Sequence, residues 1–229
     1  MSAFAMAAAD SPTELGAAVR RFVRHASPRT LIAALAVLVA ARVAVGDWSA
    51  ADLAVVAVIA LLWPVQEWLI HVFILHFEPI EAFGRTFDFE VPRSHRTHHR
   101  DPWNLEILFI PLQGYFLGVP PLLLLAFGLL PTTALALTAV AFYLALTLNY
   151  EWWHFIVHTR VKPRGALHRR LWRNHRLHHC KNEHYWFGVT MLAGDRLLGT
   201  APEQGAVETS PTCRTLGADD TLVGETANP

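Results

Sequence analysis

The sequence has little charge for its length and almost no cysteine. Of 229 residues, 17% are charged and only 2 are cysteines, Cys180 and Cys213. Two thiols cannot build a disulfide scaffold, a four-thiolate zinc site or an iron–sulfur cluster. Basic and acidic residues number 19 each, so no net positive charge supports binding to nucleic acid. A metal in this protein would therefore be held mainly by nitrogen or oxygen.

Long apolar stretches are what the sequence has instead. Four of them, with few formal charges, cover residues 30–46, 51–75, 105–130 and 132–158. A bilayer core about 30 Å thick requires about 20 helical residues, so the stretches predict membrane-spanning helices. Helices of a soluble bundle would carry a polar stripe. The predicted fold class is all-α, an integral membrane protein with about four transmembrane helices and a cytoplasmic, helical, histidine-rich metal cap.

The positions of arginine and lysine predict the orientation in the membrane. Basic residues precede the first span, lie between the second and third, and follow the fourth. Only Arg42 lies elsewhere, near the outer end of the first span, where its side chain can snorkel to the interface. The positive-inside rule places both termini and the 77–104 loop in the cytoplasm.

The same pattern divides the chain into three segments. Residues 1–29 are predicted to form a basic cytoplasmic N-terminal segment, and residues 30–200 the membrane domain. From residue 201 to 229 the chain is rich in Pro, Gly, Thr, Ala and acidic residues and has no apolar period. We therefore expect 201–229 to be a mostly disordered tail.

Ten of the 13 histidines gather in four groups at predicted cytoplasmic helix ends and loops. In each half of the chain a pair ends a span, and a His-Arg-x-His-His string follows about 20 residues later. The second string begins 80 residues after the first, so the pattern is an internal repeat rather than a chance scatter. The candidate metal ligands are His71, His76, His95, His98, His99, His154, His158, His175, His178 and His179.

The spacings suit metal binding. On a helix with about 100° per residue, His154 and His158 differ by about 40° and can reach one ion from one face. The adjacent His98 and His99 point about 100° apart and can serve two different ions, as a pair of metals requires. His71 and His76 are five residues apart, so they need a helix end, a local distortion or two different metals.

Ten imidazoles shared by two ions give about five each and leave one octahedral position for oxygen or water. This ligand set favours iron, with zinc as a substitute acquired during purification. Glu151 and His154 have the Glu-x-x-His spacing of carboxylate-bridged iron bundles, although the motif occurs once rather than twice. Glu151 is therefore a candidate ligand or supporting residue, and Glu67 is a candidate to orient the His71 ring.

The four histidine groups resemble the histidine boxes of the membrane-bound fatty acid hydroxylase/sterol desaturase superfamily. The resemblance covers roughly residues 60–200, and the segments 181–190 and 194–200 are similar to those that follow the last box in fatty acid 2-hydroxylases. It implies a non-haem di-iron centre on the cytoplasmic side of a four-helix membrane base. There, oxygen and two electrons would hydroxylate an unactivated lipid C–H bond.

The resemblance also implies partners and supporting residues. The lipid substrate would enter from the bilayer. Because no cytochrome b5 domain is present, electrons would come from a separate cytochrome b5-like or ferredoxin-like protein with its reductase. Three further residues are candidates to support the ligands: His168, His184 and Asp195.

Two other functions remain open. One is a lipid, sterol or carotenoid desaturase or hydroxylase of the same superfamily, because hydroxylation and desaturation begin with the same hydrogen abstraction. The other is a non-enzymatic membrane protein that stores or passes metal ions or binds haem. Haem would need an axial histidine pair deep in the membrane, and a transporter would need ionisable residues near the midplane, where the spans have almost none.

Overall fold

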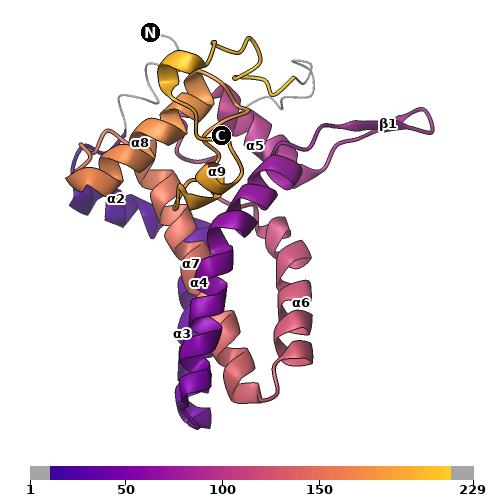
Figure 1. Cartoon of the computed structure of the whole chain (residues 1–229), viewed down its shortest axis with the longest axis vertical. Coiled ribbons are helices and arrows are strands. Elements are labelled where there is room, and N and C mark those ends of the chain that lie inside the picture. The colour runs from indigo at the N-terminus through magenta and orange to yellow at the C-terminus, as the bar shows by residue number, and fades with distance from the viewer. Residues whose placement is uncertain (1–10, 218–229) are drawn as a thin grey trace.

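A computed structural model describes residues 11–217 of the chain. It is mostly helical and divides into a bundle of four long helices and a cap at one end of that bundle (Figure 1). The bundle helices are α3 (Ala26–Val45), α4 (Ala50–Ile70), α6 (Leu112–Leu129) and α7 (Thr133–Val157). A π-helical turn, η1 (His71–Leu75), continues α4. The prediction of a helical membrane fold with four spans is confirmed.

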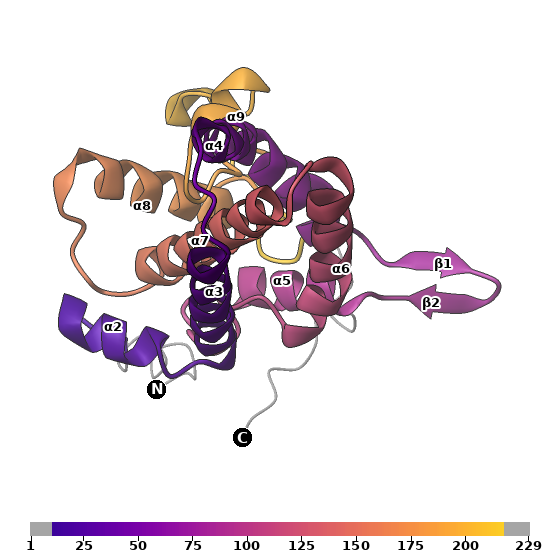
Figure 2. The same cartoon turned by 90° about the horizontal axis from the view of Figure 1, so that it is seen from below.

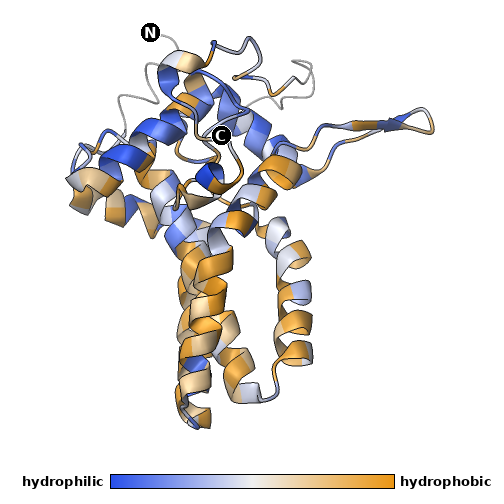
Figure 3. Ribbon diagram, in the orientation of Figure 1, coloured by the Kyte–Doolittle hydropathy of each residue, from blue (hydrophilic) through white to orange (hydrophobic). Residues whose placement is uncertain are grey.

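The bundle helices are exposed where lipid would contact them. Each is long and apolar enough to cross a membrane, and fewer than half of the residues in each span are buried. Leu61, Leu117 and Leu124 are each more than 70% exposed. Figure 3 shows the long helices largely hydrophobic and the cap largely hydrophilic. Such a surface suits a protein whose helix bundle contacts lipid and whose cap contacts water.

Helix α7 is the centre of the bundle. It packs against α3, α4 and α6, as the view along the bundle in Figure 2 also shows. Small residues such as Ala136 and Ala139 are buried along it and let the neighbouring helices approach closely. At its cap end, larger side chains such as Phe155 and Ile156 join a second apolar core under the cap.

The cap is built from shorter elements. These are α2 (Leu15–Phe22), α5 (Glu90–Arg100), α8 (Gly165–Cys180), α9 (Ala193–Leu197), a 3₁₀ turn η2 (Gln204–Ala206) and the strands β1 (Ile80–Ala82) and β2 (Arg85–Phe87). The two strands pair antiparallel, with Ile80 opposite Phe87, and form a projecting hairpin. Phe83 and Gly84 connect them with φ of 54° and 69°, as in a two-residue turn of type I′.

The third span begins later than its apolar run suggests. The apolar run covers 105–130 and Pro111 is expected to break or kink it; α6 starts at Leu112, directly after Pro111. Residues 105–111 instead fold in under the cap, where Leu105 and Leu108 are buried. Proline at this boundary is expected, because it cannot donate the backbone hydrogen bond of a helix interior.

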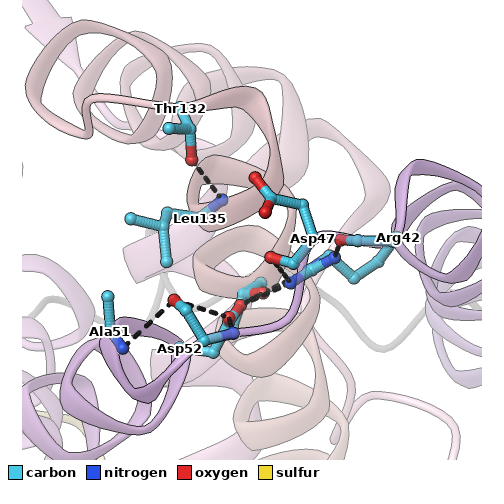
Figure 4. Close-up of polar contacts among 9 residues, drawn as sticks. Arg42, Asp47, Ala51, Asp52, Thr132 and Leu135 are labelled. Atoms are coloured by element: carbon cyan, nitrogen blue, oxygen red, sulfur yellow. Dashed lines mark hydrogen bonds and ion pairs between the residues drawn. The ribbon is translucent and has the colours of Figure 1, made fainter.

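Arg42 does not snorkel from the outer end of the first span. Its guanidinium is buried and lies 2.7 Å from the Asp52 carboxylate, and it also donates to Thr138 Oγ1 at 2.7 Å. Thr138 Oγ1 in turn donates to Asp52 at 2.6 Å, and the Trp48 ring lies 3.7 Å from the guanidinium carbon. Figure 4 shows Arg42 and Asp52 pointing toward each other. The network joins α3, α4 and α7 at the end of the bundle opposite the cap.

Candidate metal centre

The structure brings all ten predicted ligands together at the cap end of the spans and sorts them into two clusters of five. Within each cluster, one ligand atom from every residue lies within 4.8 Å of the others. The first cluster, called site A, contains His71, His76, His95, His99 and His178. The second cluster, called site B, contains His98, His154, His158, His175 and His179. Either cluster could hold a metal ion.

Site B has the ligand geometry of a high-coordinate ion. Its Nε2 atoms follow one another at 3.0 Å from His154 to His98, 3.1 Å to His179, 3.0 Å to His175 and 2.8 Å to His158. Neighbouring ligands of an octahedral ion with metal–nitrogen bonds of about 2.1 Å are separated by about 3.0 Å, whereas tetrahedral ligands are separated by about 3.4 Å. The observed separations match the octahedral arrangement.

Site A depends on the π-helical turn at the end of α4. The backbone N–H of His76 donates to the carbonyl of His71 at 3.1 Å, an i to i+5 bond in place of the α-helical i to i+4 bond. Residues five apart therefore lie on the same side of the turn, and the rings of His71 and His76 meet edge to face with their centroids 5.0 Å apart. The five-residue spacing of His71 and His76 is therefore accommodated by a local distortion of the helix, the π-helical turn.

Adjacent histidines serve different clusters. On α5, His98 faces site B and His99 faces site A, and on α8, His179 faces site B and His178 faces site A. Helices α5 and α8 therefore each contribute to both clusters. This is the arrangement that the 100° divergence of neighbouring helical residues predicts.

Four rings are oriented by backbone carbonyl groups. The Nδ1 atoms of His71, His99, His154 and His178 lie 2.7, 2.9, 3.0 and 2.8 Å from carbonyl oxygens. The respective carbonyls belong to Phe187, Cys213, Leu108 and Tyr185. A carbonyl can only accept, so each Nδ1 carries the proton and each Nε2 presents its lone pair to its cluster.

Several nitrogen atoms that face site A have no partner in the described part of the chain. They are the Nε2 atoms of His76, His99 and His178, all buried. Buried polar atoms are normally hydrogen-bonded, so an unpaired set of nitrogen atoms gathered within one cluster fits the coordination of a cation. The residues present thus suit a metal on grounds of geometry and of chemistry.

Burial keeps the cap imidazoles neutral. It lowers the pKa of His98 and His175 well below the ordinary value of 6.5, and neighbouring histidines lower it further. The pKa of His178 falls to about 4, mainly because of burial. A neutral ring has a free lone pair, which is the form that coordinates a metal.

Two of the candidate supporting residues act through the backbone rather than on a ring. In the described structure the His71 ring nitrogens bond the Phe187 carbonyl and His95 rather than Glu67. Glu67 instead accepts from the amides of Val189 and Thr190, the latter at 2.7 Å. Asp195 accepts from the amides of Phe187 at 2.9 Å and Gly188 at 2.7 Å. Both carboxylates hold the segment whose Phe187 carbonyl orients His71.

Glu151 also lies outside the ligand clusters. It accepts from the Ile110 amide at 3.1 Å and from the Tyr115 hydroxyl at 3.2 Å, and it bonds the Ser27 hydroxyl. Its partner Ile110 lies two residues after Leu108, whose carbonyl orients His154. The Glu-x-x-His spacing therefore does not bring Glu151 to the ligand atoms.

The two histidines named as candidate supporting residues are peripheral. His168 accepts from the Arg164 amide at 3.3 Å and lies against the Trp153 ring. The side chain of His184 is 71% exposed and lies beside Glu183. Neither joins the two clusters.

Sequence reasoning missed the four carbonyls and Glu183. The carbonyls could not be identified from the sequence, because every residue has a backbone carbonyl. Glu183, in contrast, is a carboxylate only 2% exposed, four residues after His179, and its place in the segment 181–190 was the available signal.

A largely apolar cavity of about 840 Å³ lies between the spans directly beneath the clusters. Side chains of α3, α4, α6 and α7 line it, among them Leu31, Ile70, Leu117 and Leu144. At its cap end it reaches three ligands, His95, His98 and His154. A long apolar chain in this cavity would end against the clusters.

Comparisons with known proteins place these features in a family. The model of the fatty acid hydroxylase family matches residues 56–200. A dihydroceramide fatty acyl 2-hydroxylase of Arabidopsis thaliana is 27% identical over 148 residues, which cover 65% of this chain and 60% of that protein. The chain thus spans about 60% of the length of this relative.

The structure of full-length Scs7p, in which only the hydroxylase domain is visible, aligns with a TM-score of 0.66 at 23% identity. That alignment covers 80% of this chain and 68% of the other, and it shows a shared fold.

Proposed function

The chain belongs to the fatty acid hydroxylase family, and we propose that it is a membrane-bound oxidoreductase that hydroxylates a C–H bond of a lipid. The observation that carries this proposal is the contact between the apolar cavity and the two histidine clusters. A ligand that fills the cavity would place one part of an apolar chain against His98 and His154. We propose a fatty acyl chain as the substrate, which agrees with the activity of the Arabidopsis relative.

We propose that each cluster holds one iron ion, with zinc as a substitute acquired during purification. Five imidazoles on each ion leave one octahedral position free. When bound, the iron pair would supply the activation of molecular oxygen with two external electrons. Neutral nitrogen ligands in both clusters, and their octahedral separations in site B, support this choice over structural zinc, which prefers four ligands including thiolates.

The protein's own residues would hold the ligands and aim the substrate. The carbonyls of Phe187 and Leu108 fix the His71 and His154 rings, so the Nε2 atoms need no rearrangement when a metal binds. The apolar cavity wall would exclude water from the reacting carbon. Because the cavity lies between the spans, the substrate could enter sideways from the bilayer.

Electrons would come from a separate cytochrome b5-like or ferredoxin-like protein with its reductase. We also propose that the cap and both termini lie in the cytoplasm, because basic residues are concentrated on the cap side. In that orientation a cytoplasmic electron carrier could reach the cap without crossing the membrane.

Isotope labelling tests the reaction type. Purified protein would receive a compatible reductase system, ¹⁸O₂ and a lipid extract, and the lipids would be analysed by mass spectrometry. A product with one labelled oxygen is expected. A product that has lost two hydrogens without gaining label would instead establish the desaturase alternative, and metal uptake without any oxygen-dependent product would favour a non-enzymatic metal-binding protein. The matched control replaces the ligand His98 by Ala and should yield no product.

A further inference from the structure

Residues 207–217 pack onto the metal centre although they lie beyond the family match. The sequence assigns them to a mostly disordered tail, but in the structure Val207, Cys213 and Leu216 are buried. The end of the expected tail, residues 218–229, lies outside the described residues. We call residues 207–217 the strap.

The strap contacts a ligand of site A directly. The Cys213 carbonyl accepts from Nδ1 of His99 at 2.9 Å. His99 is completely buried, and its Nε2 has no hydrogen-bond partner in the described part of the chain. The bond to the carbonyl therefore fixes both the ring orientation and the tautomer that presents Nε2 to site A. No other hydrogen bond holds this ring in the described structure.

The strap is tied to the ends of both cap helices that carry ligands. Just beyond α8, the buried Glu183 accepts from the hydroxyls of Ser210 at 3.0 Å and Thr212 at 2.5 Å. The Ser210 amide donates to the Lys181 carbonyl at 2.7 Å. At the end of α5, the Arg214 side chain donates to the Arg100 carbonyl at 2.9 Å. These bonds on both sides set the position of the Cys213 carbonyl.

We propose that the strap is a positioning element of site A, and that Glu183 is the residue that positions the strap. This inference rests on the proposed metal centre. Because the strap orients His99 but none of the five ligands of site B, its loss should weaken one metal site and spare the other. Loss of a hydrogen-bonding partner behind a ligand typically costs about 10–100-fold in metal affinity.

Truncation tests the strap. A chain that stops after Ala206 would be compared with one that stops after Gly217, and both would be loaded with iron or cobalt in detergent and titrated with a chelator. We expect the longer chain to retain two metals like the full chain. The shorter one should release one metal at about 10–100-fold lower chelator concentration and keep the other. Equal retention of both metals, or simultaneous loss of both, would overturn the proposal.

Point variants test Glu183 without shortening the chain. Glu183→Leu removes the acceptor for the strap hydroxyls, Glu183→Gln retains an acceptor oxygen, and Glu203→Leu alters an exposed acid as the control. In cobalt-loaded protein, Glu183→Leu should change the visible absorption of one of the two ions, and Glu183→Gln should restore most of it. Identical spectra for Glu183→Leu and Glu203→Leu would contradict the role of Glu183. A full-length chain that binds no metal would overturn the proposed function, and this inference with it.

Discussion

Glu67 and Glu151 hold matching positions in the two halves of the metal centre. Each is a buried carboxylate on a span. Glu67 lies four residues before His71, and Glu151 lies three residues before His154. Each accepts a backbone amide of an irregular segment, and a carbonyl of that segment orients the histidine, Phe187 for His71 and Leu108 for His154. The internal repeat of the sequence therefore includes the carboxylates Glu67 and Glu151, which hold the segments that orient the ligands, as well as the ligands themselves.

Replacing Glu67 tests this relationship. Glu67→Ala would leave the amides of Val189 and Thr190 without an acceptor, at a cost of about 1–3 kcal/mol per buried group. We expect a lower melting temperature and about 10–100-fold weaker metal retention at site A, which His71 joins. Metal content against chelator concentration measures the effect. Glu106→Ala, at an exposed side chain paired with Arg21, is the control and should change metal retention little.

The adjacent His98 and His99 provide a second test. His98→Ala removes a ligand of site B and His99→Ala a ligand of site A, so each variant should lose a different metal first. Both should abolish turnover while the chain still inserts in the membrane. His25→Ala, at a histidine outside both clusters, is the comparison and should retain two metals. If either ligand variant keeps full activity, its cluster is not the reaction site.

The spans and the ligand set could be predicted because each depends on a simple period. Apolar runs of about 20 residues indicated the four spans, and repeated spacings indicated the ten histidines that the structure gathers. Metal binding by them stays a prediction. The π-helical turn at His71 could not be predicted, because the same spacing also allowed a helix end or two separate metals.

Other features depend on contacts between distant segments. The carbonyls of Leu108 and Cys213 orient ligands 46 and 114 residues away. Arg42 looked free to snorkel because its partner Asp52 belongs to the next helix. The strap belongs to the segment that the sequence predicts to be a mostly disordered tail, because its composition is polar and its few buried side chains have no periodic pattern.

Acid should weaken the centre. Burial lowers the pKa of His98 and His175 well below 6.5 and that of His178 to about 4. Between about pH 6.5 and pH 4 the unfolded chain therefore binds more protons than the folded protein, so stability falls as pH falls through this window. Protons also compete with metal for the same nitrogen atoms. Melting temperature and metal content measured from pH 7.5 to 4.5 should both decrease, and a flat profile would contradict the neutral-imidazole centre.

The Arg42–Asp52 pair should matter for stability but not for the metals. Asp52→Ala leaves a buried guanidinium without its counter-ion, so we expect the melting temperature in detergent to fall by about 5–10 °C. Metal content at low temperature should be unchanged, because the pair lies at the opposite end of the bundle. Replacing both charges, Arg42→Met with Asp52→Leu, should recover much of the loss. If the double variant is less stable than Asp52→Ala, the charges themselves contribute the stability.

Cysteine labelling tests the orientation of the chain in the membrane. The basic residues are concentrated on the cap side, and Asp52 neutralises the charge of Arg42 at the opposite end. The described residues of that opposite end therefore carry no unbalanced positive charge. We therefore expect the cap to face the cytoplasm. The exposed Cys180 at the end of α8 should react with a membrane-impermeant maleimide in inverted vesicles and not in intact cells. A Cys180→Ser chain that also carries Asp47→Cys, in the turn between α3 and α4, should show the opposite pattern. Labelling of both positions from the same side would refute the four-span topology, and reversal of both patterns would place the metal centre on the outer face.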